Sequence, residues 1–263
     1  KPQTPNPKPQ TPNPKPLMGF NCCKEAEKDQ FKGPKHLAPP PLKIALNSNF
    51  EKKENLILEV YRTVHLARIE EILDPEYFPL SEAICENIRH KGIPELPNSP
   101  SRSNISKLKD GSFFCGDTDN GKATGPGYLL TPQGDLVISN FKQGMAEGTG
   151  NIYFRKGDYF TGRLVHSMPF EGTMQFQNGS VFKGSFENCQ FHDHGILTFP
   201  DGREYIGNFA SGKKHGEGKF TWKDGSKFEG VWEKDHMTEE GKFIDPMGGV
   251  HEGRPRGQQF YTK

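Results

Sequence analysis

A repeat of 22 or 23 residues fills the second half of this 263-residue chain and constrains its fold more than any other feature. Each unit begins with a residue that is usually apolar and most often aromatic. The unit starts are Phe114, Val137, Phe160, Phe182, Tyr205, Phe228 and His251. A chain with this period is expected to fold as a stack of similar units, because each unit buries its apolar face only against its neighbours.

Glycines recur at fixed places within each unit. Two residues after the start lies a glycine in every unit except the second, which has Ser139. A later glycine occupies positions 127, 150, 172, 195, 218 and 241, and a closing one occupies 134, 157, 179, 202, 225 and 248. The closing glycine often follows Asn or Asp, as in Asn178-Gly179, and we expect these dipeptides to form tight primed hairpin turns.

Alternating apolar positions within each unit predict two β-strands. Because successive side chains of a strand point to opposite faces, the start residue, the glycine two residues later and the residue four later share one face. We expect the glycine to leave room for aromatic rings to lie across the backbone. The predicted fold is therefore mainly β, an elongated single-layer sheet of stacked 23-residue hairpins.

Large rings gather on one face of this expected sheet, and a single layer of strands is not expected to hide them by itself. We predict that they form a partner-binding aromatic face, covered either by a helix of this chain or by a helix of another protein. The rings concerned are Phe141, Phe154, Phe176, Phe186, Phe199, Phe209, Trp222 and Trp232.

The first half of the chain divides into three further segments. Residues 1–49 begin with KPQTPNP written twice and predict a Pro-rich extended tail, either a tether or a ligand for the aromatic groove of a partner. Residues 50–92 predict a helical docking segment. Its stripe of Leu56, Val60, Val64 and Ala67 indicates a helix over 50–73, and Ser81 and Gly92 are expected to cap a shorter helix. Residues 93–110 read as a linker, and residues 111–263 as six full repeats plus a partial seventh.

Composition narrows the functional classes. The formal net charge is +1, with 34 basic and 33 acidic side chains, so the chain lacks the charge expected of a protein that grips nucleic acid. The longest apolar run, Leu56-Ile57-Leu58, is too short to cross a bilayer. Five cysteines without paired spacing favour a reducing compartment. The chain starts at Lys1 rather than Met, so we expect it to be a processed product or part of a longer protein.

Three short motifs could carry chemistry, and context argues against each. GNFASGKK, residues 207–214, is close to a phosphate-binding loop, but its register places it in a strand and a bend with no helix following. His192-Asp193-His194 could suggest a metal site, yet no Cys or acidic set repeats at ligand spacing. Cys22-Cys23 could be acylated, although ordinary thiols are the simpler interpretation. We therefore expect no cofactor, no metal, no small-molecule substrate and no enzymatic activity.

The repeat resembles a known family. Unit five, YIGNFASGKKHGEGKFTWKDGSKF, shows Y-x-G, then G-x-G, then a closing Gly, which resembles the MORN repeat (membrane occupation and recognition nexus) over residues 114–263. Phe170, Asp193 and Glu239 depart from the pattern in units three, four and six. The resemblance implies a scaffold that binds other proteins of a multi-subunit cytoskeletal assembly in the cytoplasm, especially radial spokes and other complexes of the ciliary axoneme. Lipid kinases and a SET-domain methyltransferase carry such repeats, but this chain has no motif of either catalytic domain.

The same resemblance leaves a second function open, a peripheral phospholipid-binding or membrane-tethering module. Units five and six hold a local set of basic residues that could face an anionic membrane. These are Lys213, Lys214, Lys219, Lys223 and Lys227. Acidic residues, among them Asp224, Glu229 and Glu233, lie among them and favour a solvated, mixed-charge edge instead.

Overall fold

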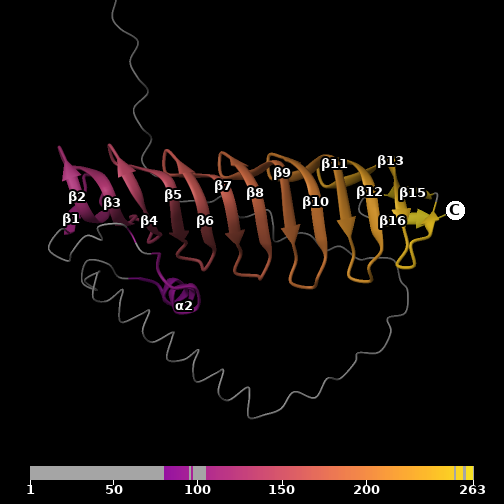
Figure 1. Cartoon of the computed structure of the whole chain (residues 1–263), viewed down its shortest axis with the longest axis horizontal. Coiled ribbons are helices and arrows are strands. Elements are labelled where there is room, and N and C mark those ends of the chain that lie inside the picture. Colours follow the sequence, from indigo (N-terminus) through magenta and orange to yellow (C-terminus); the bar gives the residue numbers. More distant parts are fainter. Residues whose placement is uncertain (1–79, 95, 97–104, 252, 257–258, 263) are drawn as a thin grey trace, which may run out of the picture.

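The computed structural model describes residues 80–94, 96, 105–251, 253–256 and 259–262. The Pro-rich tail over 1–49 and the helix predicted over 50–73 lie outside these residues. Within the described part, the chain forms one long antiparallel sheet, one short helix and a small separate hairpin (Figure 1). The prediction of an elongated, mainly β array of stacked hairpins is confirmed.

Fourteen strands form the sheet, and each pairs with the strand before and after it in sequence. The first eight are β1 (Ile105–Lys107), β2 (Phe113–Asp119), β3 (Lys122–Leu130), β4 (Leu136–Lys142), β5 (Met145–Tyr153), β6 (Tyr159–Val165), β7 (Met168–Gln175) and β8 (Val181–Glu187). The remaining six are β9 (Gln190–Thr198), β10 (Glu204–Ala210), β11 (Lys213–Thr221), β12 (Lys227–Glu233), β13 (His236–Ile244) and β14 (Val250–His251). The strands β15 (Gly253–Arg256) and β16 (Gln259–Thr262) pair only with each other. The edge strand β1 lies in the segment that the sequence predicted as a linker.

The predicted short helix is present with both of its caps. Helix α2 spans Glu82–Lys91, with Ser81 as its N-cap and Gly92, at φ 73°, as its C-cap. The Ile84 N–H donates to Ser81 Oγ at 3.4 Å, which satisfies one of the donors that a helix start leaves open.

Two kinds of turn alternate along the sheet, and their placement differs from the prediction. Tight two-residue turns with positive φ at both residues join the strands of each unit, as at Ser211-Gly212. The closing dipeptides lie instead in the longer turns between units. At Asp201-Gly202 only the glycine has positive φ, and Asp201 Oδ1 accepts from Arg203 N at 3.2 Å. The prediction of primed turns at the closing dipeptides was wrong, because their Asp and Asn side chains bond two residues ahead and favour a different turn.

One face of the sheet, called here the inner face, carries an apolar row in which each residue pairs with the next across the strands. The row runs through Phe114, Leu129, Val137, Ile152, Phe160, Met174, Phe182, Leu197, Tyr205, Phe220, Phe228 and Phe243. Rings of this row lie over paired glycines: a Cβ added at Gly195 would stand 2.6 Å from Phe182 Cζ. The expected role of the glycines in making room for rings is confirmed.

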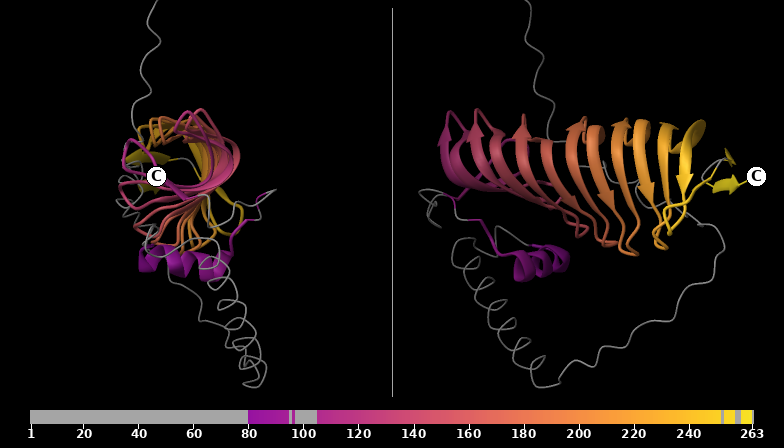
Figure 2. Two further views of the ribbon diagram at one scale, coloured as in Figure 1. Left: turned by 90° about the vertical axis from the view of Figure 1, so that its left-hand side faces the viewer. Right: turned by 45° about the vertical axis from the view of Figure 1, so that its right-hand side comes forward.

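The strands curl around the long axis of the array, so the inner face lines an interior filled by its own side chains (Figure 2). Neighbouring rings there meet edge to face, as Phe182 and Phe209 do with centroids 5.2 Å apart. In the described part of the chain, this curl hides the rings without a covering element. The expectation that a single-layer sheet cannot do so was wrong, because twist and coiling turn one face of the sheet toward itself.

Candidate functional site

The opposite face of the sheet, called here the outer face, carries two rows of paired side chains whose character changes along the array. From β2 to β6 these rows are mostly apolar and include Tyr128, Leu136, Ile138, Tyr153 and Tyr159. In units five and six the paired positions include Lys219, Glu229 and Lys242. The outer face therefore presents surfaces of different chemical character along one continuous sheet.

Helix α2 covers the apolar part of the outer face. Ile84 and Ile88 are both fully buried and join the cluster of Leu136, Ile138 and Tyr153. Their spacing of four residues places both on one side of the helix, which is the side that meets the sheet. In Figures 1 and 2 the helix lies outside the curl of the sheet, below the strands β4 to β6 toward the N-terminal end of the array. This contact shows how a short amphipathic helix binds the array.

Polar contacts fix the position of α2 along the sheet. Ser81 Oγ donates to Arg155 O at 3.0 Å, and Asn87 Nδ2 donates to Gly157 O at 2.8 Å, so the helix is tied to the turn between β5 and β6. At its other end, Tyr153 Oη donates to Gly92 O at 2.7 Å. Burial raises the pKa of Tyr153, which keeps its hydroxyl protonated and able to donate.

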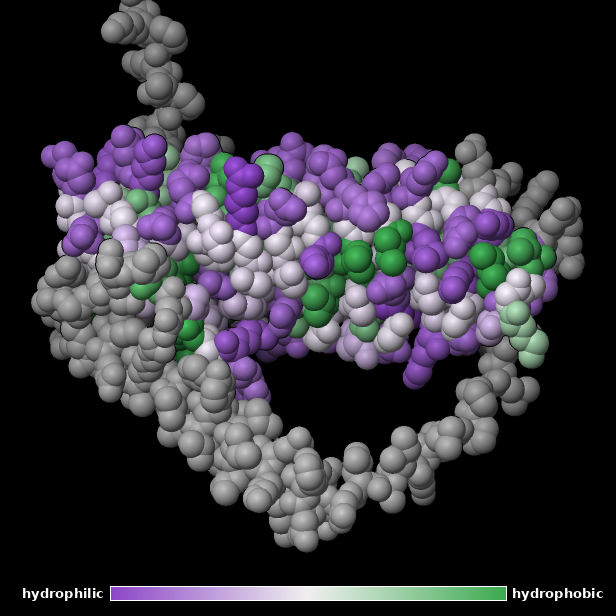
Figure 3. Space-filling model, viewed as in Figure 1, coloured by the Kyte–Doolittle hydropathy of each residue, from purple (hydrophilic) through white to green (hydrophobic). Residues whose placement is uncertain are grey.

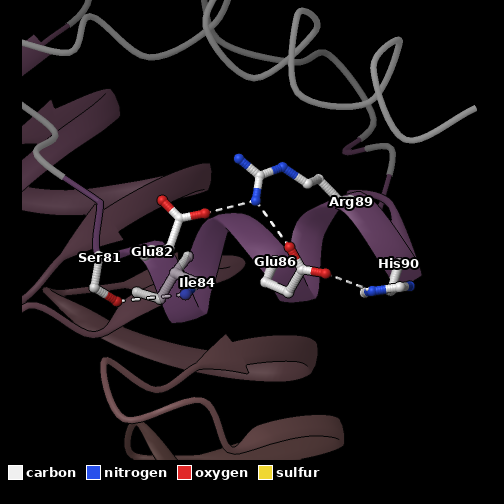
Figure 4. Close-up of polar contacts among 6 residues, drawn as sticks. All are labelled: Ser81, Glu82, Ile84, Glu86, Arg89 and His90. Carbon is white, nitrogen blue, oxygen red and sulfur yellow. Dashed lines mark hydrogen bonds and ion pairs between the residues drawn. The ribbon is translucent and has the colours of Figure 1, made fainter. Parts of the chain in front are cut away.

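The far side of α2 is polar and faces solvent. Arg89 contacts Glu82 at 2.6 Å and Glu86 at 2.8 Å, and Glu86 also contacts His90 at 2.6 Å (Figure 4). The hydrogen bonds from Arg89 and then His90 lower the pKa of Glu86. These exposed pairs help the helix hold its shape but add little binding energy. The affinity of α2 for the sheet therefore comes from its apolar side and its ties to the turn.

Beyond α2 the outer face continues into a second apolar area, called here the outer patch and formed by Val181, Ile196 and Ile206. All three are partly exposed, and Ile196 pairs directly with Ile206 across β9 and β10. Figure 3 shows hydrophobic surface in the middle of the array, over β8 to β10. The Ile196–Ile206 pair is flanked by Lys183 on β8 and Lys219 on β11.

Sequence reasoning missed the outer patch. The predicted binding face was built from the start residue of each unit and the ring four positions later, and both belong to the inner face. The available signal was the alternate set, because Val181, Ile196 and Ile206 are each one residue away from an inner-row residue. At these positions the following unit carries Glu204, Lys219 and Glu229.

All eight rings predicted as a partner-binding face are buried, and each is at most 9% exposed. They belong to the interior cluster, where Trp232 Nε1 donates to Gly218 O at 3.3 Å. Trp222 is the least satisfied of them, since its buried Nε1 has no hydrogen-bond partner among the described residues. The set comprises Phe141, Phe154, Phe176, Phe186, Phe199, Phe209, Trp222 and Trp232. An open aromatic docking stripe is therefore not what the structure presents, because the curl of the sheet encloses these rings.

The five lysines proposed for lipid binding do not form one surface. Lys213 follows a tight turn at one end of the strands, and exposed Lys223 lies in a long turn at the other end. Lys219 and Lys227 lie on the outer face, while Lys214 is only 1% exposed. Its Nζ lies 5.7 Å from the Trp232 ring and 3.4 Å from Asp235 Oδ1. Lys214 cannot contact a membrane surface, because it packs inside the curl.

The other chemical motifs are also placed. Gly207 of GNFASGKK lies in β10, and the motif turns directly into β11 with no helix, as predicted. No group of His, Cys, Asp and Glu suited to a metal occurs in the part of the chain that the structure describes, and no helix there has the length and apolar character of a membrane span. A cavity of about 250 Å³ lies between α2 and the third hairpin, lined by residues that include Asn87, Lys91 and Gln175. It is smaller than typical small-molecule sites of roughly 300–1,000 Å³.

Comparison with solved structures finds only distant similarity. The TCP domain of SAS-4 (dCPAP) from Drosophila melanogaster, solved in complex with a proline-rich motif of Ana2 (dSTIL), is 16% identical and covers 65% of this chain and 99% of that domain, with a TM-score of 0.34. The TCP10 domain of Danio rerio CPAP is 16% identical over 60% of this chain and 97% of that domain, with a TM-score of 0.23. We draw no conclusion from similarities at these scores.

Sequence comparison identifies the repeat. Human alsin is 27% identical over 142 residues, which cover 45% of this chain but 8% of alsin. Alsin of Rattus norvegicus is 31% identical over 98 residues, which cover 35% of this chain and 6% of that protein. The MORN repeat profile matches residues 138–159, 205–227 and 228–250, which correspond to the second, fifth and sixth hairpins. The chain therefore contains MORN repeats in the register that the glycine pattern predicted.

Proposed function

We propose that this protein is a non-enzymatic scaffold whose repeat array holds helices of partner proteins on its outer face. The observation that carries the proposal is the packing of α2, a ten-residue helix, across the outer face of the first units. The outer patch is a second apolar area of the same face, over β8 to β10. An amphipathic helix suits such a surface because it offers apolar side chains at every third or fourth position.

The two faces have separate tasks in this proposal. The interior is filled by a continuous cluster of rings and aliphatic side chains, which supports a structural role. From β8 to β13 the outer face can vary with little effect on the fold, because its residues there are partly or fully exposed while the inner row is buried. Substitutions of Phe209 or Trp232 would unfold the array rather than test docking, since both are interior residues.

The test places two charges on the outer patch. The double substitution Ile196→Asp and Ile206→Asp is expected to leave the melting temperature within a few degrees, because both side chains are already partly exposed. It should abolish the co-sedimentation of the protein with its native assembly. Thr221→Asp, on the outer face of β11, is the matched control and should still co-sediment. Equal incorporation of the double variant would contradict docking at the outer patch.

The resemblance of the repeats to those of axonemal proteins is the support for placing this scaffold in a cytoskeletal assembly, and we propose the ciliary axoneme. The expected result is that the tagged protein stays with detergent-extracted axonemes and lies at regular intervals along them in immunogold images. Release of the whole pool with the soluble or membrane fraction would contradict this location.

A further inference from the structure

The outer patch has the size and setting of a site for one more helix. Its three aliphatic residues span β8 to β10, about 10 Å across the strands. It lies on the same face as the α2 contact and begins at Val181 on β8, next to β7, where Gln175 accepts from Lys91 Nζ of α2 at 2.5 Å. A helix bound there would lie beside α2 and continue an interface that the chain already forms.

The sequence that precedes α2 has the pattern of such a helix. Leu56, Val60, Val64 and Ala67 recur at steps of four, four and three, which places them on one side of a helix. This stripe is about 17 Å long, enough to cross the three strands of the outer patch. Its apolar residues need a surface, because a helix of this length is only marginally stable alone.

The connection between residues 50–73 and α2 is long enough to let that segment reach the outer patch, and it also restricts where the segment can bind. Six residues separate Leu73 from Leu80, and Leu80 packs against the outer face of the first units. A connection of this length reaches at most about 25 Å. From the β5–β6 turn, to which Ser81 is tied, β8 to β10 lie about 10–20 Å along the array. The tether therefore keeps the segment near the outer patch at an effective concentration in the millimolar range.

The acidic residues at the end of the stripe are opposite in charge to the lysines beside the outer patch. Glu70 and Glu71 follow Ala67 by three and four residues, so they extend the stripe by one turn. This end of the stripe is the one joined to α2. Of the two lysines that flank the outer patch, the exposed Lys183 on β8 is nearer to α2 than Lys219 on β11. A helix that runs from β8 toward β10 with decreasing residue number would bring the acidic pair to Lys183.

We infer that residues 50–73 bind the outer patch as a helix beside α2, so that the chain itself occupies the docking face until a partner helix displaces it. This inference rests on the proposed function, since it names what holds the same face in the absence of a partner. Partner binding would then be competitive, and loss of the stripe would strengthen it.

The test uses the purified full-length chain without any partner. A photo-crosslinking benzoylphenylalanine replaces Ile196, and peptides joined to it are identified by mass spectrometry. The expected product is an intramolecular crosslink to residues 50–73, lost in a second protein that also carries Val60→Asp and Val64→Asp. Ile244, a partly exposed aliphatic residue on the outer face of β13, is the control position and should not crosslink to the segment.

Each outcome decides the inference. Crosslinks to other segments, equal crosslinks from position 244, or a product of twice the mass that disappears on dilution would overturn it, the last in favour of exchange between two copies. Amide hydrogen exchange gives an independent reading: residues 56–67 should be protected, and Ile206→Asp should remove that protection. Failure here would leave the proposed function standing, because the co-sedimentation test measures incorporation into the assembly and not binding of the segment.

Discussion

The inner and outer faces share the same strands and register, yet their residues follow opposite rules. The inner row is apolar in all six hairpins, from Phe114 to Phe243. The outer rows change from tyrosines and aliphatics, through the outer patch, to lysine and glutamate pairs such as Lys242 and Glu229 at 3.2 Å. Among the described residues the inner face is covered by its own side chains, so every unit must contribute the same kind of side chain. The outer face is covered by α2 in the first units and is partly exposed farther along, so its residues can differ from unit to unit.

The largest effect should come from closing the space under an inner ring. Gly195→Val would drive its side chain into Phe182, whose Cε2 lies 2.6 Å from the position of a Cβ, and into Lys183 O at 3.2 Å. We expect a loss of at least about 3 kcal/mol in the free energy of unfolding, measured by urea titration.

The control for this change lies on the other face of the same strand. Thr198 is partly exposed on the outer face, so Thr198→Val should change the free energy of unfolding by less than about 0.5 kcal/mol. Similar stability of the Gly195→Val and wild-type proteins would mean that the rings do not need the glycines, and the contrast between the faces would fail.

A smaller, local effect is expected at the covered part of the outer face. Ile88→Asp places a charge where α2 meets the sheet, and we expect a loss of about 3 kcal/mol in docking free energy. Hydrogen exchange should show the amides of 82–91 losing protection while β9 to β12 keep theirs. Arg89→Ala on the solvent side should change neither set; collapse of protection over the whole array would show that α2 is part of the core.

Local signals explain how much of this fold the sequence could predict. The 23-residue period sets the register of the hairpins. Ser81 and Gly92, the residues directly before and after α2, mark both of its ends in the sequence. The turn types were harder to place, because Asp201 favours two turn geometries and its bond to Arg203 N selects one.

Features that depend on many strands at once were not predictable in this way. The curl that encloses the rings accumulates from the twist of successive strands, and no single unit encodes it. The sequence predicted Lys214 as an exposed basic residue. Its side chain instead lies in the interior against Trp232 and Asp235, which belong to the next unit. The outer patch escaped notice because its residues are partly exposed and follow no period of their own.

The hydrogen bond between Tyr153 and the C-cap of α2 tests how strongly the outer face holds this helix. Tyr153→Phe removes the hydroxyl that donates to Gly92 O at 2.7 Å and leaves that buried carbonyl without this donor. We expect a loss of about 1–2 kcal/mol, seen as a lower urea midpoint. Tyr159→Phe, which removes a hydrogen bond to Asn151 within the sheet, is the comparison. Tyr159 meets α2 through its ring, 5.2 Å from Lys91 Nζ, and Phe keeps that ring, so only the loss of the Tyr153 hydroxyl should raise hydrogen exchange in 82–91.

The smallest effect concerns a carboxylate that joins two successive turns. Asp135 is buried, accepts from Arg155 N at 2.8 Å, and burial raises its pKa above the usual value near 3.8. A raised folded pKa means that stability is fully present below the unfolded pKa and is lost as pH rises through the folded value. Asp135→Asn keeps an acceptor without the charge, so it should be more stable than wild type at pH 7, by less than about 1 kcal/mol, and equal to it near pH 3. Asp158→Asn, at the equivalent, half-exposed position that accepts from Gln177 N, is the control for the substitution itself. If Asp135→Asn were less stable at pH 7 and equal at pH 3, the charge on Asp135 would be strengthening the link between turns more than its burial weakens it.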